Sequence, residues 1–400
     1  MRDSSLPAFD LVVGGVPRFR AEAPWAWRLL ARYLRDLPAA FRVEAPGRDL
    51  LVSDVSGASE IVLVHADPEA YLLPEVGARL LAALAGHPET VLVLPVSNES
   101  ESDATRRAPP FAYLTPTLLA EAVEFLGREA AALRPVRAAS SPVYVIRRKA
   151  LRALPPDLPL RRVPEEAEAC GLAAAVDPGA YVHRYGAMDA SAREDLAARV
   201  PRGARAVLDV GCSRGATAAA LRERGVQRIV GIEPDVEDAA AAALLYDEVL
   251  TSRLEDVGEL RERFDAILFG DVLEHLEDPS DALVRVRPWL GTDGIVIASV
   301  PNVGHWTIID DLLRGRFDYV PYSLLSGTHI RFFTRRTLED LFEASGYRVT
   351  SIETTIVPPS PLGEARLARL RAFPSASADL DVSEFLAVAS ARSGSAGGGQ

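Results

Sequence analysis

The sequence has 400 residues, 48% hydrophobic and 25% charged, which is enough apolar material for two folded domains and excludes a wholly disordered chain. Its formal net charge of −12 disfavours a protein that grips phosphate backbones, because nucleic-acid binding usually needs a basic face. The only cysteines are Cys170 and Cys212, so a disulfide framework and zinc-finger spacing are excluded and a reducing compartment is favoured.

The first part of the chain alternates short apolar runs with helical patterns. Buried strands are predicted at 61–64, 91–94 and 143–146. Amphipathic helices are predicted at 73–85 and 117–133, where Leu, Ala and Val recur at three- and four-residue spacing. Residues 1–165 are therefore expected to form an α/β domain.

A change of composition follows this domain. Residues 166–200 come after four closely spaced prolines and contain an acidic, alanine-rich stretch, so they are predicted to be a connector that leads into a helix. At the other end, residues 392–400 are rich in Gly and Ser and have too little apolar surface to offset the entropy of ordering. A disordered tail is expected there.

The C-terminal half, residues 201–391, alternates strands and helices more regularly. Strands are predicted at 205–210, 228–233, 247–251, 264–270, 293–300, 346–355 and 383–390. Helices are predicted at 215–225, 236–246, 279–290 and 334–345. This alternation implies right-handed crossovers and a largely parallel sheet covered on both faces, so the fold class is α/β in both halves.

No stretch approaches the eighteen or so apolar residues that a membrane-spanning helix needs, and the N-terminus has no apolar core of a secretory signal. We expect a cytoplasmic protein with neither a membrane nor a nucleic acid as its partner.

The first motif is an apolar strand that runs into a turn of small residues, V-L-D-V-G-C-S-R-G at 207–215. Gly211 and Gly215 let the backbone approach a ligand closely, and the helix that follows presents unpaired N–H groups at its positive dipole end. About two dozen positions after Asp209, the next strand ends in Glu233, whose carboxylate can accept hydrogen bonds from both hydroxyls of a ribose. The pair indicates a cofactor that contains adenosine.

A third motif, F-D-A-I-L-F-G-D-V-L-E-H-L-E-D-P at 264–279, completes the set. In order and in spacing, these motifs and I-E-P-D at 232–235 resemble the class I, Rossmann-like S-adenosylmethionine-dependent methyltransferases. The resemblance implies a seven-stranded sheet with its last strand antiparallel, S-adenosyl-L-methionine as cofactor and S-adenosyl-L-homocysteine as product.

The resemblance also implies the cofactor-binding residues, which are Asp209, Gly211, Ser213, Gly215, Glu233, Leu254, Gly270, Asp271 and Val272. The glycine loop would run along the methionine portion of the cofactor, Glu233 would bind its ribose, and residues 270–272 would line the opposite wall of the pocket. Two positions depart from the family. Ser213 replaces a frequent glycine, and Arg253 stands where an acid often contacts the adenine amine, which leaves Leu254 to pack on the ring.

Two alternatives for the glycine loop are an ordinary tight turn and a nicotinamide-dinucleotide site on the same fold. The compact G-x-S-x-G run lacks the G-x-G-x-x-G spacing that a dinucleotide site requires, so the methyl donor is favoured.

Methyl transfer to a hydroxyl needs the acceptor oxygen held against the methyl carbon and a base that takes its proton. Three histidines fall where strands are expected to end, and they rank as candidate bases in the order His275, His305, His329, with Asp271 as an orienting partner. The alternative for His275 is a capping or packing role, and for His329 a role in tying down a lid. The lid is predicted at 301–333, a connection longer than such folds usually need and rich in aromatic residues.

No metal is predicted. Asp271, Glu274 and His275 have side chains that can ligate a metal, yet their close spacing at a strand end is explained by cofactor packing.

The N-terminal domain weakly resembles a degenerate GT-A glycosyltransferase in the segments 92–99 and 143–149, although a D-x-D metal motif is missing. The hypotheses for this domain are recognition of a glycosylated or carrier-bound acceptor, formation of a homodimer, or a plain scaffold.

The prediction for the whole chain is O-methylation of a small polar metabolite or a sugar-containing natural product. The alternatives are N- or C-methylation, a non-catalytic domain that binds S-adenosylmethionine, and a glycosyltransferase with an accessory C-terminal domain.

Overall fold

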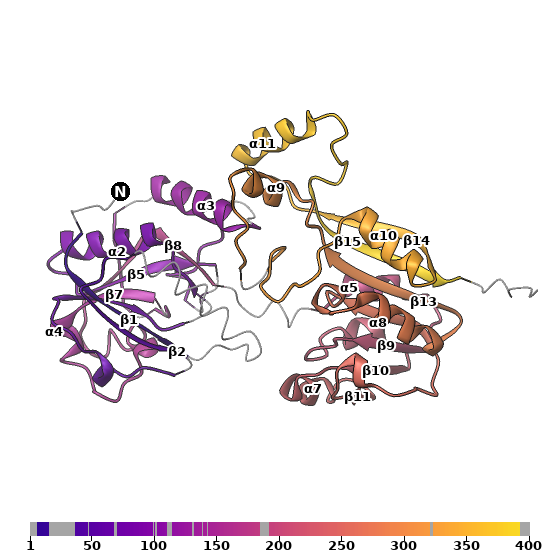
Figure 1. The fold of residues 1–400 in the computed structure, drawn as a ribbon. Coiled ribbons are helices and arrows are strands. Elements are labelled where there is room, and N and C mark those ends of the chain that lie inside the picture. The colour runs from indigo at the N-terminus through magenta and orange to yellow at the C-terminus, as the bar shows by residue number, and fades with distance from the viewer. Residues whose placement is uncertain are drawn as a thin grey trace, which may run out of the picture. The chain divides into compact units, whose positions relative to one another are not determined.

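The computed structural model describes residues 6–15, 37–46, 48–67, 70–98, 100, 102–109, 114–129, 132–137, 139–141, 143–184, 192–320 and 323–392. The chain divides into two compact units (Figure 1). The N-terminal unit comprises residues 1–186 and 318–322, and the C-terminal unit comprises 187–317 and 323–400.

The N-terminal unit is a mixed α/β domain, as the sequence predicts. Its strands are β1 (Phe9–Gly15), β2 (Phe41–Pro46), β3 (Ile61–His65), β4 (Ala70–Tyr71), β5 (Leu92–Ser97), β6 (Arg134–Val136), β7 (Val143–Arg147) and β8 (Ala174–Arg184). They form one sheet in the order β2-β1-β3-β7-β5-β8-β4, with β6 also paired to β8. Its helices are α2 (Pro74–Gly86), α3 (Pro116–Glu129) and α4 (Arg148–Leu151), with short 3₁₀ turns at Val52–Asp54 and Leu160–Arg162.

The structure corrects the predicted connector at 166–200. Residues 174–184 form β8, which pairs with β4, β5 and β6 and is buried over most of its length. The sequence hides this strand because Asp177, Pro178 and Gly179 interrupt its apolar pattern. Asp177 is nevertheless 3% exposed, and its carboxylate accepts two hydrogen bonds from the guanidinium of Arg79, at 2.8 and 2.9 Å. An ion pair in the core thus permits a charge inside a buried strand.

The C-terminal unit has the predicted seven-stranded sheet. Its strands are β9 (Ala206–Val210), β10 (Arg228–Ile232), β11 (Glu248–Leu250), β12 (Phe264–Gly270), β13 (Leu290–Pro301), β14 (Tyr347–Ile356) and β15 (Val382–Ala391). They lie in the order β11-β10-β9-β12-β13-β15-β14, and the first five are parallel. The last strand, β15, is antiparallel to both of its neighbours, which confirms the predicted topology.

Helices connect these strands and cover two apolar cores, one on each face of the sheet. They are α5 (Glu194–Arg199), α6 (Ala218–Glu223), α7 (Val236–Ala242), α8 (Pro279–Val286), α9 (Trp306–Leu313), α10 (Arg335–Ala344) and α11 (Pro361–Arg371), with 3₁₀ turns η4 (Leu254–Asp256), η5 (Leu273–His275) and η6 (Arg287–Trp289). Among the described residues, none of the helices combines the length and the apolar composition of a bilayer crossing.

The segment 301–333, expected to be a lid, contains α9, and Trp306 at its first turn is 1% exposed. The end of the segment is tied to the sheet, because Asn302 and Phe333 form a parallel bridge and the N–H groups of Ile330 and Arg331 both donate to the carbonyl of Glu274. Within this segment, residues 318–320 group with the N-terminal unit, where Val320 is part of the core. Tyr322, predicted for the lid, and residues 393–400 of the predicted tail lie outside the described residues.

Candidate active site

The topology brings the three sequence motifs to one edge of the C-terminal sheet. The parallel strands β9, β10, β12 and β13 end there together, as the register pairs Val210 with Ile232 and with Phe269, and Gly270 with Ser299. The antiparallel β15 begins at the same edge, where Glu384 pairs with Pro301. Open α/β sheets bind their ligands at this edge.

The loop after β9 adopts a left-handed backbone at three of its residues. The φ angles are 73° at Gly211, 45° at Ser213 and 80° at Gly215. A Cβ at position 211 would lie 2.5 Å from Cγ2 of Val272, and one at 215 would lie 3.0 Å from the Cα of Ala242. Both glycines are thus required by close backbone approach, whereas Ser213 carries a side chain in a conformation that favours glycine.

Glu233 is fixed by two backbone hydrogen bonds. The N–H of Ser213 donates to Oε2 and the N–H of Asp235 donates to Oε1, both over 2.9 Å. The residue is 8% exposed, and this burial raises the pKa of its carboxyl although the two bonds oppose the shift. A carboxylate held in this way keeps one lone pair on each oxygen, which suits it to accept hydrogen bonds from a diol.

Asp209 lies beneath the loop rather than on its surface. It is 6% exposed, and the hydroxyl of Tyr246 donates to its Oδ2 over 2.6 Å. Burial raises the pKa of Asp209 to about 6, because the charged form loses its hydration, while the Tyr246 bond acts in the opposite direction.

Asp271, at the end of β12, has φ of 54°, a strained value for a residue with a side chain. Its N–H donates to the hydroxyl of Ser299 over 3.0 Å, and that hydroxyl donates to Asp271 Oδ1 over 2.8 Å. The other oxygen, Oδ2, accepts from Nη1 of Arg193. A local network thus holds the strained residue in place.

Arg193, just before α5, was not found from the sequence. Its guanidinium also donates to both oxygens of Asp195, at 3.0 and 2.8 Å, and to Glu384 at 2.6 Å. These partners lie up to 191 positions apart in the chain, so no local pattern points to the cluster. Burial, followed by the charge of Asp271, raises the pKa of Glu384 to about 7 although Arg193 opposes the shift.

Leu254 begins η4 and is 4% exposed, whereas the neighbouring Arg253 is exposed. The loop that carries them passes Glu233, because the N–H of Ser252 donates to the carbonyl of Glu233 over 3.2 Å. The predicted contact of Leu254 with the adenine ring stays a prediction.

The structure separates the three candidate histidines into two groups. His305 is 1% exposed and caps α9, where its Nδ1 lies 2.8 Å from the hydroxyl of Thr307 and accepts from the N–H of Thr307. Burial lowers the pKa of His305 to about 4. These contacts give His305 a structural role at the helix end.

His275 and His329 lie together, with ring centroids 4.9 Å apart in an edge-to-face arrangement. Partial desolvation lowers the pKa of His275 although the residue is exposed at the surface, and desolvation of the half-buried His329 lowers its pKa to about 4. One ligating atom from each of Glu274, His275 and His329 lies within 4.8 Å of the others. From the sequence, the possible metal ligands are Asp271, Glu274 and His275. The set in the structure contains His329 in place of Asp271, because folding brings the segment after α9 next to η5.

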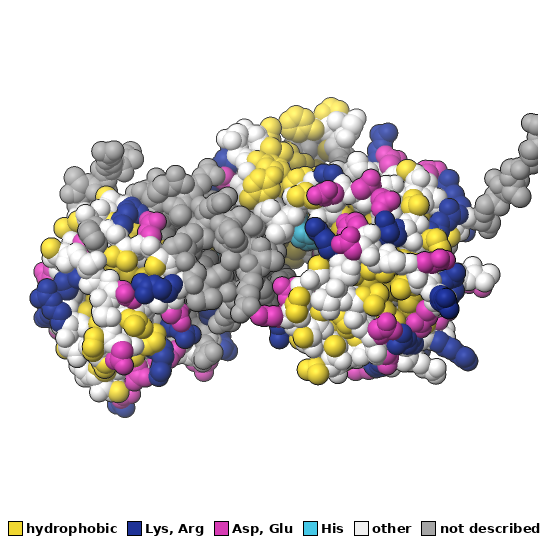
Figure 2. All heavy atoms as spheres, turned by 60° about the horizontal axis from the view of Figure 1, so that its bottom comes forward, with side chains coloured by type: hydrophobic (Ala, Val, Ile, Leu, Met, Phe, Trp, Pro, Cys, Tyr) yellow, Lys and Arg dark blue, Asp and Glu magenta, His cyan; other side chains and the backbone are white. Residues whose placement is uncertain are grey.

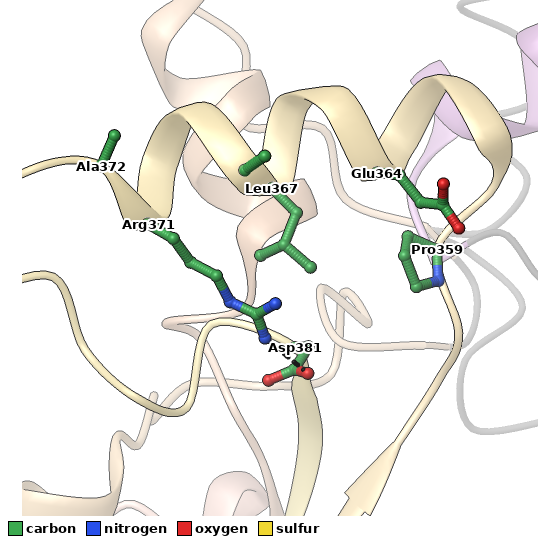
Figure 3. Close-up of a pocket in the computed structure, with 7 residues that line it drawn as sticks. Pro359, Glu364, Leu367, Arg371, Ala372 and Asp381 are labelled. Carbon is green, nitrogen blue, oxygen red and sulfur yellow. Dashed lines mark ion pairs between the residues drawn. The ribbon is translucent and has the colours of Figure 1, made fainter.

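Two hollows lie elsewhere on the C-terminal unit. One of about 620 Å³ lies beside α11, where Arg371 points toward Asp381 and pairs with it at 2.7 Å (Figure 3). The other, of about 590 Å³, has an apolar wall that includes Ile309, Leu313 and Phe373. Apolar side chains gather over the region of α9 and α11 (Figure 2). Neither hollow contains a predicted cofactor residue, so we do not place the cofactor in them.

Comparison with known proteins gives one family model and several similar proteins. Residues 181–352 match a family model described as a methyltransferase domain. The chain is 31% identical over 193 residues to a ubiquinone biosynthesis O-methyltransferase of Nitrobacter winogradskyi, covering 46% of this chain and 68% of the relative. It is 34% identical over 128 residues to the protein of the same name from Bradyrhizobium diazoefficiens, covering 31% of this chain and 49% of the relative. The chain thus spans between about half and two thirds of these relatives.

Among solved structures, a putative S-adenosylmethionine-dependent methyltransferase from Listeria monocytogenes is 16% identical, with a TM-score of 0.37, over 50% of this chain and 97% of the other. Strands β1 to β7 of the N-terminal unit precede the residues of the family match, and β8 overlaps only its first residues. The resemblance of this unit to GT-A glycosyltransferases stays a prediction.

Proposed function

This chain belongs to the class I S-adenosylmethionine-dependent methyltransferases, and from that membership we propose that it transfers a methyl group to an oxygen atom of a small polar acceptor. The observation that carries the proposal is the hydrogen bond from the N–H of Ser213 to Glu233. It joins the glycine loop to the acid that ends the next strand, so the two parts of the expected adenosine site are held in one arrangement.

The residues present fit S-adenosylmethionine. Gly211, Ser213 and Gly215 carry no bulky side chain, and Glu233 presents an oriented carboxylate that can accept hydrogen bonds from the ribose hydroxyls. Val272 packs on Gly211 and, with Gly270 and Asp271, would form the opposite wall. When bound, the cofactor supplies a methyl group on a sulfonium, and the protein's task is to hold the acceptor oxygen in line with it.

The choice of an oxygen acceptor has support from the relatives, which are named as O-methyltransferases of ubiquinone biosynthesis. As a narrower proposal, which rests on the sequence alone, the acceptor is a sugar-containing natural product. N- or C-methylation and a non-catalytic domain that binds the cofactor are the alternatives. We expect the N-terminal unit to serve acceptor recognition or formation of a homodimer, and hydrolysis of a nucleotide sugar by the chain would instead favour a glycosyltransferase.

Binding of the cofactor is tested by titration calorimetry with S-adenosylmethionine and S-adenosylhomocysteine. We expect Glu233→Ala to weaken both at least tenfold, because the ribose hydroxyls lose a charged partner. The matched control is Glu237→Ala, which removes an acid from the first turn of α7 near the same loop. Equal affinity of wild type and Glu233→Ala would contradict the proposed site.

The acceptor is sought by incubating the full chain with methyl-labelled cofactor and a metabolite extract. Label in an alkali-stable methyl ether supports the proposal. Label on nitrogen or carbon favours the alternatives, and cofactor binding without any labelled product favours a non-catalytic domain.

A further inference from the structure

Glu274 has a buried carboxyl group for which the described residues supply no partner. The residue is 0% exposed, and within the described part of the chain neither Oε1 nor Oε2 has a hydrogen-bond partner. Leaving such a group unsatisfied is costly, and a bound cation beside the carboxylate would remove that cost. The backbone is firmly placed, since the carbonyl of Glu274 accepts hydrogen bonds from Ile330 and Arg331 at 2.9 and 3.0 Å.

Two imidazoles beside it are oriented by backbone carbonyls. Nδ1 of His275 lies 3.2 Å from the carbonyl oxygen of Thr328, and Nδ1 of His329 lies 3.2 Å from that of Leu324. A carbonyl oxygen only accepts, so each Nδ1 must carry the hydrogen. In the neutral ring this leaves a lone pair on Nε2. Metal-binding histidines are oriented by this kind of hydrogen bond, which fixes the tautomer and the ring plane.

We propose that Glu274, His275 and His329 bind a divalent transition-metal ion through the Glu274 carboxylate and the Nε2 atoms of the two imidazoles. One ligating atom from each residue already lies within 4.8 Å of the others. Ligand atoms around a tetrahedral zinc ion stand about 3.4 Å apart, from bond lengths of about 2.0–2.1 Å, so binding draws the side chains together by roughly 1 Å. Two imidazoles with one carboxylate suit Zn²⁺ or Fe²⁺ better than Mg²⁺ or Ca²⁺, which prefer oxygen ligands.

An ion at this site would have two effects, one on the fold and one on the chemistry. His275 belongs to η5 and His329 to the segment after α9, so an ion would clamp that segment to the end of β12. Three protein ligands also leave a fourth position for water or for an acceptor oxygen. The use of that position in activating an acceptor hydroxyl rests on the proposed methyl transfer, whereas binding of the ion does not.

Binding is tested on the full chain without a polyhistidine tag, after dialysis against a chelator. Zn²⁺, Co²⁺ and Mg²⁺ are titrated alone, without cofactor or acceptor, by calorimetry and, for Co²⁺, by visible absorption. We expect one Zn²⁺ per chain, a tetrahedral Co²⁺ spectrum and Mg²⁺ affinity at least a hundredfold weaker. Glu274→Gln and His329→Ala should each weaken Zn²⁺ at least tenfold.

Glu277→Gln is the matched control, because it removes an exposed carboxylate three residues from Glu274. Glu274→Gln keeps the shape of the side chain, and its thermal melting without metal shows whether it folds. Zn²⁺ affinity that is the same in wild type, Glu274→Gln and His329→Ala, or no Zn²⁺ binding at all by the wild type, overturns the proposal. Because no cofactor is present, either result leaves the proposed methyltransferase function to its own test.

Discussion

A Cβ placed on Gly211 would lie 2.5 Å from Cγ2 of Val272, closer than such atoms approach in proteins. The two residues follow β9 and β12, strands separated by more than fifty positions in the chain but adjacent in the sheet. Contact between these loops, together with the φ angle of 73°, is the structural reason for glycine at this position.

Gly211→Ala should therefore destabilise the C-terminal unit by about 1–3 kcal/mol, through left-handed strain and overpacking against Val272. Adding Val272→Ala removes the clash but not the backbone strain, so the double variant should recover part of the loss. Chemical denaturation of the two single variants and the double variant measures this coupling. Strictly additive effects would show that the two side chains do not meet.

Ser213→Gly should raise stability by a few tenths to about 1 kcal/mol. The φ angle of 45° costs a residue with a Cβ more than it costs glycine, and this gain exceeds the added entropy of the unfolded chain. Ser213→Ala is the control, because it removes the hydroxyl and keeps the strain. If both variants melt alike, the hydroxyl rather than the backbone sets the stability at this position.

Because of Asp209, the free energy of unfolding of the C-terminal unit should decrease as the pH rises from about 4 to about 6. Its pKa is about 6 in the folded state against 3.8 for an ordinary Asp, so the folded state binds more protons than the unfolded state across that window. Asp209→Asn removes this titration. Relative to wild type, the variant should gain roughly 3 kcal/mol between pH 4 and pH 7, from two pKa units at 1.36 kcal/mol each.

Urea denaturation of both proteins at pH 4, 5, 6 and 7 checks the sign and the window for Asp209. Parallel stability curves would mean that Asp209 titrates normally. Tyr246→Phe should extend the window to higher pH, because the folded-state carboxylate loses the hydroxyl that stabilises its charge, while the lower edge stays at the pKa of the unfolded state.

Arg193→Ala should destabilise the site by about 1–3 kcal/mol and weaken cofactor binding, because Asp271 loses the guanidinium that holds its strained backbone. Its carboxylate partners are 23 to 46% exposed, so water replaces part of the interaction. The pKa of Glu384 should rise further without Arg193. Adding Glu384→Gln to Arg193→Ala should restore part of the stability. A double-mutant cycle that shows no coupling between the two positions would contradict the proposed network.

The apolar pattern of the sequence by itself determined where the strands of the C-terminal sheet lie, whereas the antiparallel direction of the last strand came from the family resemblance. The reason is local, since buried parallel strands are continuous apolar runs and their connecting helices have a clear period. It also determined the edge where Gly211, Glu233 and Asp271 meet, because strands that run in parallel must end together. It did not reveal β8, whose central Asp177 is compensated by an Arg79 nearly one hundred positions away.

Only the tertiary structure decided the contacts made by side chains that are distant in the chain. It joined Arg193 to Asp271 and Glu384, and it brought His329 next to Glu274 and His275. It also buried His305 in a helix cap, although His305 follows the end of a strand closely, as His275 does. Hydrophobic periodicity reports which face of an element is buried, but it carries no information on which polar groups will share that burial, because their pairing energy exists only once the chain has folded.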